Sequence, residues 1–302
     1  MTRSYVWMLA FLAAVWGASY LFIKVAVEEI EPALMTFLRL AVAGLLLLPV
    51  LLARTGVRRG LGQLRGAARP GFTLGIVNAA VPFTLIAWGE KHIDSGIAAI
   101  ANATVPLFVV LLAIRFRPSE RVRGGRMAGI LLGLVGVAVL AGAQPDGGLW
   151  AVAGTLAVVL ASLSYASGSL YGQLRVADTP GSVLATASML GGALLVLPFA
   201  ALQLPDELPG WRAVGSLVVL AVLGTAVAQL VLFRMLRLHG STRTSLVTYL
   251  LPPTAVLYGA LLLDERLSLA TFAGLALILP AVALGSGSLR LLRGKQPLVE
   301  PS

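Results

Sequence analysis

The chain contains no cysteine and only two histidines, His92 and His239, which stand far apart in the sequence. The absence of cysteine excludes disulfide bonds, thiolate zinc sites, iron–sulfur clusters and cysteine nucleophiles. Two isolated histidines cannot form the paired-histidine helix of a zinc metalloprotease. No nucleophile–base pair or set of metal ligands stands out elsewhere. The sequence therefore predicts neither an enzyme nor a cofactor-dependent protein.

Charge is also scarce, because 12% of the 302 residues are charged while 58% are apolar, and the mean hydropathy is +0.91. Soluble domains carry about 25% charged residues, so a soluble fold of this size would lack the side chains to coat itself. The exterior must instead face lipid. One crossing takes roughly 20 apolar residues, which leaves room for ten crossings.

Ten long apolar segments can be marked along the chain. Because every backbone N–H and C=O in lipid must be paired within its own segment, each segment is predicted to be a helix. The sequence thus predicts an all-α integral membrane protein with ten transmembrane helices. The segments are residues 5–27, 32–53, 70–90, 94–115, 124–143, 150–171, 182–202, 212–236, 241–263 and 268–289.

The basic residues follow this alternation. Most of the 23 Lys and Arg residues fall on the side of the N-terminus, which is also the side of the tail, residues 290–302. The positive-inside rule makes this side cytoplasmic. The chain is therefore predicted to cross a bacterial cytoplasmic membrane with both termini in the cytoplasm. The excess positive charge is therefore predicted to lie in the cytoplasmic loops and not on a nucleic-acid-binding surface. The expected partners are the lipid bilayer and a small-molecule substrate.

An internal repeat organises the chain. Each half contains a serine, a proline eleven residues later and then a Glu-Arg pair. The members are Ser95, Pro106 and Glu120-Arg121 in the first half and Ser241, Pro252 and Glu265-Arg266 in the second. In addition, Trp16 and Pro49 align with Tyr165 and Pro198 at a common offset of 149. The sequence predicts two five-helix halves, residues 5–143 and 150–289.

The odd number of helices in each half has a consequence for orientation. The second half enters the membrane from the opposite face, so the halves are predicted to be related by a two-fold axis in the membrane plane. Such inverted repeats are typical of alternating-access transporters. The alternative is that duplication only builds a larger bundle.

The run Trp16-Gly17-Ala18-Ser19, the Ser-Gly, Pro and Glu-Arg block and the ten-helix duplication resemble the EamA-type drug/metabolite transporters. The resemblance covers about residues 5–289. It implies a five-plus-five inverted repeat around a central substrate cavity, and it implies export or import of amino acids, sugars, nucleotide derivatives or drugs. The second copy departs from the pattern, because it reads Tyr165-Ala166-Ser167-Gly168 where Trp-Gly stood.

Polar and aromatic residues within the predicted helices are candidates for the cavity wall, since polar groups in hydrocarbon are costly and tend to face a bundle interior. The candidates are Trp16, Arg39, Asn78, Asn102, Tyr165, Gln229 and Tyr249. The alternative is that these side chains only pack or join neighbouring helices. Pro106, Pro252 and Pro253 each remove a backbone donor, so they are predicted to kink their helices and to form gates.

Two cations within the first two predicted helices need an explanation. Lys24 is near the outer end of its segment and is expected to extend to the interface. Arg39 lies about seven residues into its helix, at a cost of about 3 kcal/mol unless paired or hydrated. It could pair with Glu28 or Glu31, or it could face the cavity and attract a carboxylate or phosphate.

No acidic residue is predicted at mid-depth, which argues against a carrier of lipophilic cations and favours a neutral, zwitterionic or weakly anionic metabolite such as an amino acid. Any proton coupling would have to use the rim group of Glu90, Lys91, His92 and Asp94, which reads more simply as a solvated turn. The sequence thus predicts a secondary transporter. The alternative is a receptor or channel-like scaffold on the same bundle.

Glycines at a spacing of four mark one face of the fifth predicted helix. They are Gly125, Gly129 and Gly133. Small residues at this spacing permit close helix contact, either within the chain or between the two copies of a homodimer.

Overall fold

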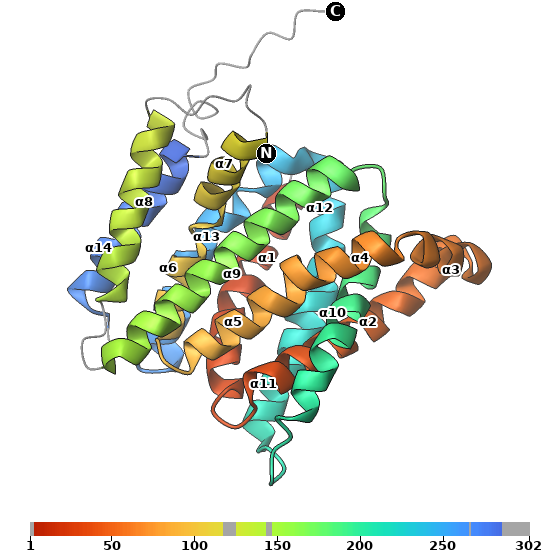
Figure 1. Ribbon diagram of the computed structural model, residues 1–302, viewed down its shortest axis with the longest axis horizontal. Helices are drawn as coiled ribbons and strands as arrows, with labels where there is room; N and C mark the ends of the chain where they lie inside the picture. Colours follow the sequence, from red (N-terminus) through yellow and green to blue (C-terminus); the bar gives the residue numbers. More distant parts are fainter. Residues whose placement is uncertain (1–2, 117–124, 143–146, 266, 286–302) are drawn as a thin grey trace, which may run out of the picture.

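The computed structural model describes residues 3–116, 125–142, 147–265 and 267–285, and every regular element in these ranges is helical (Figure 1). The first half contains α1 (Arg3–Ala26), α2 (Pro32–Thr55), α3 (Val57–Gly66), α4 (Ala68–Gly75), η1 (Ile76–Ala80), α5 (Val81–Glu90), α6 (Ser95–Asn102), α7 (Val105–Phe116) and α8 (Gly125–Ala141). The second half contains α9 (Gly148–Arg175), α10 (Gly181–Ala201), α11 (Trp211–Ala221), η3 (Val222–Val227), α12 (Ala228–Thr244), α13 (Val247–Leu262) and α14 (Leu269–Gly285). The tail 290–302 and the Glu120-Arg121 pair lie outside the described residues.

Seven helical stretches of the described residues are long and apolar enough to cross a membrane. Three shorter apolar helices occupy the other predicted segments, at Met127–Ala141, Val247–Leu262 and Leu269–Leu284. The all-α, multi-pass architecture is therefore confirmed, whereas the number of ten crossings stays a prediction. The chain enters α1 and leaves α14 at the same end of the bundle, which we call the terminal end (Figure 1).

Helix α3 was not among the predicted segments, and it replaces a predicted connection. Its sequence alternates arginines such as Arg58 and Arg65 with Leu61 and Leu64, which makes it short and amphipathic. Leu64 packs against a small cluster that includes Val183 of α10, while Leu61 is exposed. The hydropathy of this stretch is too low for a crossing, so a search for long apolar runs passes over it.

The predicted helix 241–263 begins later than expected. Gly240 takes a left-handed backbone (φ 75°), and α12 continues beyond it to Thr244. A turn at residues 245–246 separates α12 from α13. Because glycine tolerates positive φ without steric cost, Gly240 sets the bend between the eighth and ninth predicted segments.

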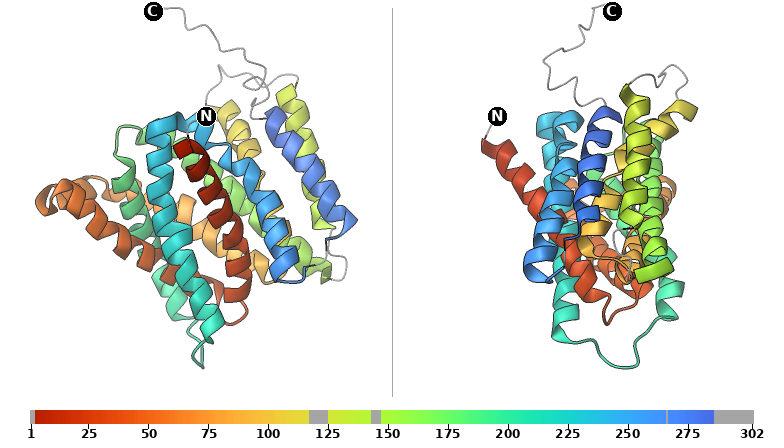
Figure 2. Two further views of the ribbon diagram at one scale, coloured as in Figure 1. Left: turned by 180° about the vertical axis from the view of Figure 1, so that it is seen from behind. Right: turned by 90° about the vertical axis from the view of Figure 1, so that its left-hand side faces the viewer.

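Helix contacts between the halves come in matched sets (Figures 1 and 2). The second helices of the halves, α2 and α10, pack together, and so do the fifth helices, α8 and α14. The first helix α1 packs on α13, and its counterpart α9 packs on α6 and α7. Likewise α5 packs on α9 while α11 and α12 pack on α1. Each contact thus has a partner under exchange of the halves.

Glycines allow the closest of these contacts. A Cβ on Gly75 of α4 would lie 2.6 Å from the backbone nitrogen of Gly192 in α10, so the two helices meet backbone to backbone. On α8, Gly129 is buried, and Gly136 faces Ile278 of α14. Gly133 faces Leu107 of α7. Gly133 and Gly136 therefore pack against helices of the same chain, whereas the surroundings of Gly125 lie outside the described part of the structure, and a homodimer stays a prediction.

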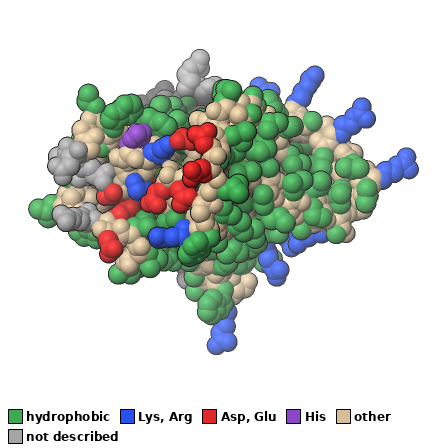
Figure 3. Space-filling model, turned by 90° about the horizontal axis from the view of Figure 1, so that it is seen from below, with side chains coloured by type: hydrophobic (Ala, Val, Ile, Leu, Met, Phe, Trp, Pro, Cys, Tyr) green, Lys and Arg blue, Asp and Glu red, His purple; other side chains and the backbone are tan. Residues whose placement is uncertain are grey.

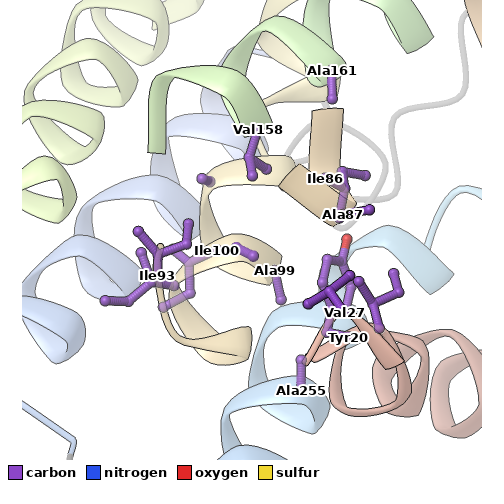
Figure 4. Close-up of a cluster of buried hydrophobic side chains, with 14 of the residues drawn as sticks. Tyr20, Val27, Ile86, Ala87, Ile93, Ala99, Ile100, Val158, Ala161 and Ala255 are labelled. Atoms are coloured by element: carbon purple, nitrogen blue, oxygen red, sulfur yellow. The ribbon is translucent and has the colours of Figure 1, made fainter. Parts of the chain in front are cut away.

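The end opposite the terminal end is closed by apolar packing. Buried side chains of α1, α5, α6, α9 and α13 meet there, among them Val27, Ile86, Ile100 and Val158 (Figure 4). Seen from this side, acidic side chains gather with a few cations over part of the surface (Figure 3). We call this end the closed end.

Candidate functional site

A cavity of about 430 Å³ lies between the two halves, within the range of small-molecule sites. It is lined by residues from both halves. They are Trp16, Ser19, Tyr20, Ile23, Arg39, Asn78, Phe83, Ile86, Ala99, Asn102, Ala103 and Val105 from the first half and Tyr165, Ser169, Gly224, Thr225, Gln229, Leu232, Thr248 and Leu251 from the second. The structure thus brings together the predicted candidates Trp16, Arg39, Asn78, Asn102, Tyr165 and Gln229.

The first half presents its cavity residues partly through the π-helical segment η1. The backbone N–H of Val81 donates to the carbonyl of Ile76, five residues earlier, and the following Pro82 has no N–H to donate. The carbonyl of Val77 is thereby released from the helix ladder, and it accepts the hydroxyl of Ser164 in α9 at 2.7 Å. Asn78, the next residue, is exposed within the cavity wall. Single π-turns of this kind are frequent at functional sites.

The second half contains the matching segment η3. There the backbone N–H of Ala228 donates to the carbonyls of Leu223 and Thr225. The carbonyl of Gly224 accepts the indole Nε1–H of Trp16 in α1 at 3.1 Å. In each half, therefore, a π-segment carbonyl is bound by a side chain from the first helix of the other half. Sequence reasoning missed both segments, and Pro82 is the one local signal for η1.

Arg39 is buried and held from two sides. Its Nε–H donates to Thr225 Oγ1 of η3 at 2.8 Å, and its guanidinium carbon lies 4.0 Å from the ring centroid of Phe83. Arg39 thus takes the second of the two predicted alternatives, since it lines the cavity and pairs with neither Glu28 nor Glu31. The contact with Phe83 is a cation–π interaction, in which a desolvated cation is stabilised by the ring face.

Asn102 joins three helices at the cavity wall. Its Nδ2 donates to the hydroxyl oxygen of Tyr20 in α1 at 2.7 Å, and its Oδ1 accepts the hydroxyl of Ser162 in α9 at 3.1 Å. Its backbone carbonyl, which Pro106 deprives of a donor, lies 3.4 Å from the same Ser162 hydroxyl. Helix α6 ends at Asn102 and α7 begins at Val105, so the helix is interrupted just before Pro106, and a gate at Pro106 stays a prediction.

The prolines of the second half lie within a helix. Helix α13 runs through both Pro252 and Pro253, and the turn at residues 245–246 precedes it. A kink or gate at these two prolines stays a prediction. The structure does not bring Tyr249 to the cavity. Its hydroxyl lies 3.5 Å from the carbonyl of Val282 in α14, and Thr248 lines the cavity instead.

The predicted rim group is not a uniformly solvated turn. The side chain of Glu90 is fully buried, and its two carboxylate oxygens have no hydrogen-bond donor among the described residues. Lys91 forms an ion pair with Glu31 at 2.7 Å. The ring of His92 stacks on Trp150 at 5.1 Å, and burial together with the positive charge of Lys91 lowers the pKa of His92.

Lys24 is fixed at the closed end and does not extend freely to water. Its ammonium donates to the backbone carbonyls of Glu90 and Ile93 at 2.7 and 2.8 Å. A separate contact nearby joins the two halves. The carboxylate of Glu265, in the second half, accepts the N–H groups of Ser95 and Gly96 at the start of α6 in the first half. A carboxylate is favoured at a helix N-terminus by the helix dipole and the free N–H groups.

Exposure differs along the cavity. Tyr20, Ile86 and Ala99, toward the closed end, are buried. Ser169, in the part of α9 nearer the terminal end, is exposed. The cavity is therefore shut at the closed end and more open toward the terminal end.

Comparison with known proteins gives the following similarities. The family model described as the EamA-like transporter family matches residues 3–142 and again residues 152–286. The uncharacterized inner membrane transporter YedA of Escherichia coli (strain K12) is 32% identical, over 96% of this chain and 92% of that protein. A probable amino-acid metabolite efflux pump of the same organism is 25% identical, over 92% of this chain and 93% of that protein. One solved crystal structure, 24% identical, superposes with a TM-score of 0.67 over 97% of this chain and 99% of that one, and it supports the fold.

Proposed function

This chain belongs to the EamA-like transporter family, and from that premise we propose that it is a secondary transporter moving a small metabolite across the cytoplasmic membrane by alternating access. The observation that carries the proposal is the central cavity, which residues of both halves line and which packed side chains shut at one end. A cavity of this form holds a solute in contact with one compartment at a time.

The two-fold organisation supplies a second conformation. The matched contacts of the halves, and above all the pair Ser164 to Val77 and Trp16 to Gly224, support the predicted inverted repeat. The family model also matches each half separately. If the halves exchange their conformations, the cavity shuts at the terminal end and opens at the closed end with similar energy.

The orientation follows from charge. Arg54, Arg58, Arg59 and Arg65 gather at the end of α2 and in α3. The predicted alternation of crossings puts this connection on the side of the termini. The positive-inside rule then places the termini in the cytoplasm, with ten crossings between them. In this conformation the cavity faces the cytoplasm.

The substrate we propose is a neutral, zwitterionic or weakly anionic metabolite such as an amino acid. No carboxylate stands among the described residues lining the cavity, so a lipophilic cation would find no counter-charge there. The names of two relatives as probable amino-acid metabolite efflux pumps support this substrate class.

The experiment is substrate counterflow in proteoliposomes. The purified protein is reconstituted with one unlabelled amino acid or small carboxylic acid inside, and uptake of the same labelled compound is followed from a dilute outside solution. We expect a transient accumulation for at least one compound of a broad panel, which a channel or an inert scaffold cannot produce. Asn102→Leu, which removes a polar group from the cavity wall, should slow counterflow at least about tenfold.

Tyr249→Phe is the matched control, since Tyr249 lies away from the cavity and loses only a hydroxyl. Its counterflow should stay close to that of the wild type. The proposal fails if no compound of the panel exchanges, or if uptake only equilibrates the label without overshoot.

A further inference from the structure

Arg39 is placed as a binding group. It is the one charged side chain among the described residues that line the cavity. Two contacts fix it, because Thr225 takes the Nε–H and the ring of Phe83 lies beneath the guanidinium plane. The Thr225 hydroxyl is itself fixed, since it donates to the carbonyl of Leu220 at 2.9 Å. A guanidinium held in this way loses little freedom when a ligand arrives.

The positive charge of Arg39 has no ion-pair partner within the described part of the chain. No carboxylate oxygen there lies within 4.0 Å of its guanidinium, and Lys91 with Glu31 forms the ion pair that is present. Glu90 acts on Arg39 electrostatically but from beyond that distance. A buried cation without a partner is costly in a membrane protein, so a charge of opposite sign that enters the cavity is strongly favoured.

The N–H donors of Arg39 that bond no described residue have a defined arrangement. Its Nε–H is bound to Thr225, and no described residue accepts a hydrogen bond from the two terminal Nη groups. These two nitrogens form the planar edge that binds the two oxygens of a carboxylate in parallel. The geometry of the free edge therefore matches a carboxylate better than a single neutral acceptor.

The rest of the wall fits an apolar body. Trp16, Tyr20 and Tyr165 present aromatic surface, and Ile23 and Ile86 add aliphatic surface toward the closed end. The volume of about 430 Å³ is at the lower end of the range for small-molecule sites. No described acidic residue lines the cavity, so the wall offers no negative counter-charge to an ammonium group, and the ligand does not need one.

Resting on the transport function proposed above, we propose that this cavity binds compact monocarboxylates with an aromatic or branched apolar body, anchored by the carboxylate on the free edge of Arg39. Amino acids of this shape belong to the class, and so do carboxylic acids without an amino group. The carboxyl group is the recognised feature, and blocking it removes binding.

The test compares two isosteric probes, 3-phenylpropionate and its neutral amide, by calorimetric titration of the purified wild-type protein. We expect the acid to bind at least about tenfold more tightly than the amide, because a hydrogen bond to a charged group is worth more than one to a neutral group. Equal affinity for the two probes, or no binding of the acid, would overturn the proposal without any variant.

Variants then assign the discrimination to Arg39. In Arg39→Gln the acid should lose its advantage, so that the ratio of the two affinities falls to about one, while Arg39→Lys should keep part of it. Arg212→Gln, an exposed cation outside the cavity lining, should keep the full ratio. Retention of the wild-type ratio in Arg39→Gln contradicts the assignment. If only neutral solutes show counterflow, the carboxylate proposal is wrong and the transport function is retained. If the acid binds but no compound shows counterflow, the transport function is wrong and the carboxylate proposal is retained.

Discussion

At the scale of single residues, the site depends on carbonyls that its own helices do not satisfy. The π-segment η1 releases the carbonyl of Val77, which Ser164 binds from the opposite half, and Trp16 binds the carbonyl of Gly224 in η3 in the same way. A buried carbonyl without a donor costs free energy comparable to a lost hydrogen bond. These two side chains therefore hold the halves in register around the cavity.

We predict that Ser164→Ala lowers the stability of the protein by about 0.5–1.5 kcal/mol, because the partly buried Val77 carbonyl then loses the hydroxyl donor that replaces its helix partner. Ser167→Ala is the matched control on the same helix, since among the described residues the Ser167 hydroxyl bonds only the Leu163 carbonyl of its own turn. Thermal unfolding in detergent measures both. Equal melting temperatures for the two variants would show that the Val77 carbonyl does not need Ser164.

Six of the cavity residues could be predicted one by one, because a polar or aromatic side chain deep in an apolar helix is costly unless it faces a bundle interior. Arg39 and Asn102 are such residues, and both line the cavity. The aromatic hydroxyl of Tyr249 predicts a cavity residue, but the neighbouring Thr248 has the register that faces the cavity. Thr225 could not be predicted, since a threonine bonded to its own helix is unremarkable in sequence and only the π-turn brings it to Arg39.

At the scale of elements, close helix contact does much of the positioning. Helix α4 meets α10 at Gly75 and Gly192. Because η1 with Asn78 follows α4 directly in the chain, this contact fixes where η1 and Asn78 lie in the bundle. Hydropathy was sufficient to find the long helices, because lipid dictates both their length and their composition. It could not find α3 or the π-segments, which differ from their surroundings in polarity or in hydrogen-bond register and not in apolar length.

We predict that Gly75→Ala is destabilising and reduces the yield of folded protein. The added Cβ would lie 2.6 Å from the Gly192 nitrogen and 2.7 Å from the Ser188 carbonyl, so α4 and α10 must separate. An overpacked contact of this kind costs about 1–3 kcal/mol. The measurement is the melting temperature in detergent.

Gly215→Ala in α11 is the control, because a Cβ there meets nothing within 4 Å. It should leave stability unchanged or raise it slightly through better helix propensity. A Gly75→Ala protein as stable as Gly215→Ala would contradict the close contact of α4 with α10.

At the scale of the whole molecule, the proposed alternating access requires two halves that exchange conformations. The repeat was visible in sequence through matched serines, prolines and aromatic residues. The structure adds matched helix contacts and matched π-segments, which the predicted duplication would explain. Which end of the cavity is shut could not be predicted, because two conformations related by exchange of the halves satisfy the same sequence pattern.

Alternating access is tested most directly by the accessibility of one cavity residue from both sides. The chain has no cysteine, so Asn78→Cys introduces a single thiol in the middle of the cavity wall. Gly147→Cys, in the connection at the closed end, is the topology control and should react from one side only. Both are treated with a membrane-impermeant thiol reagent in vesicles of each orientation. We predict that the thiol at position 78 reacts from both sides, with faster reaction from the terminal end, whereas reaction from one side alone under every substrate condition would contradict the account.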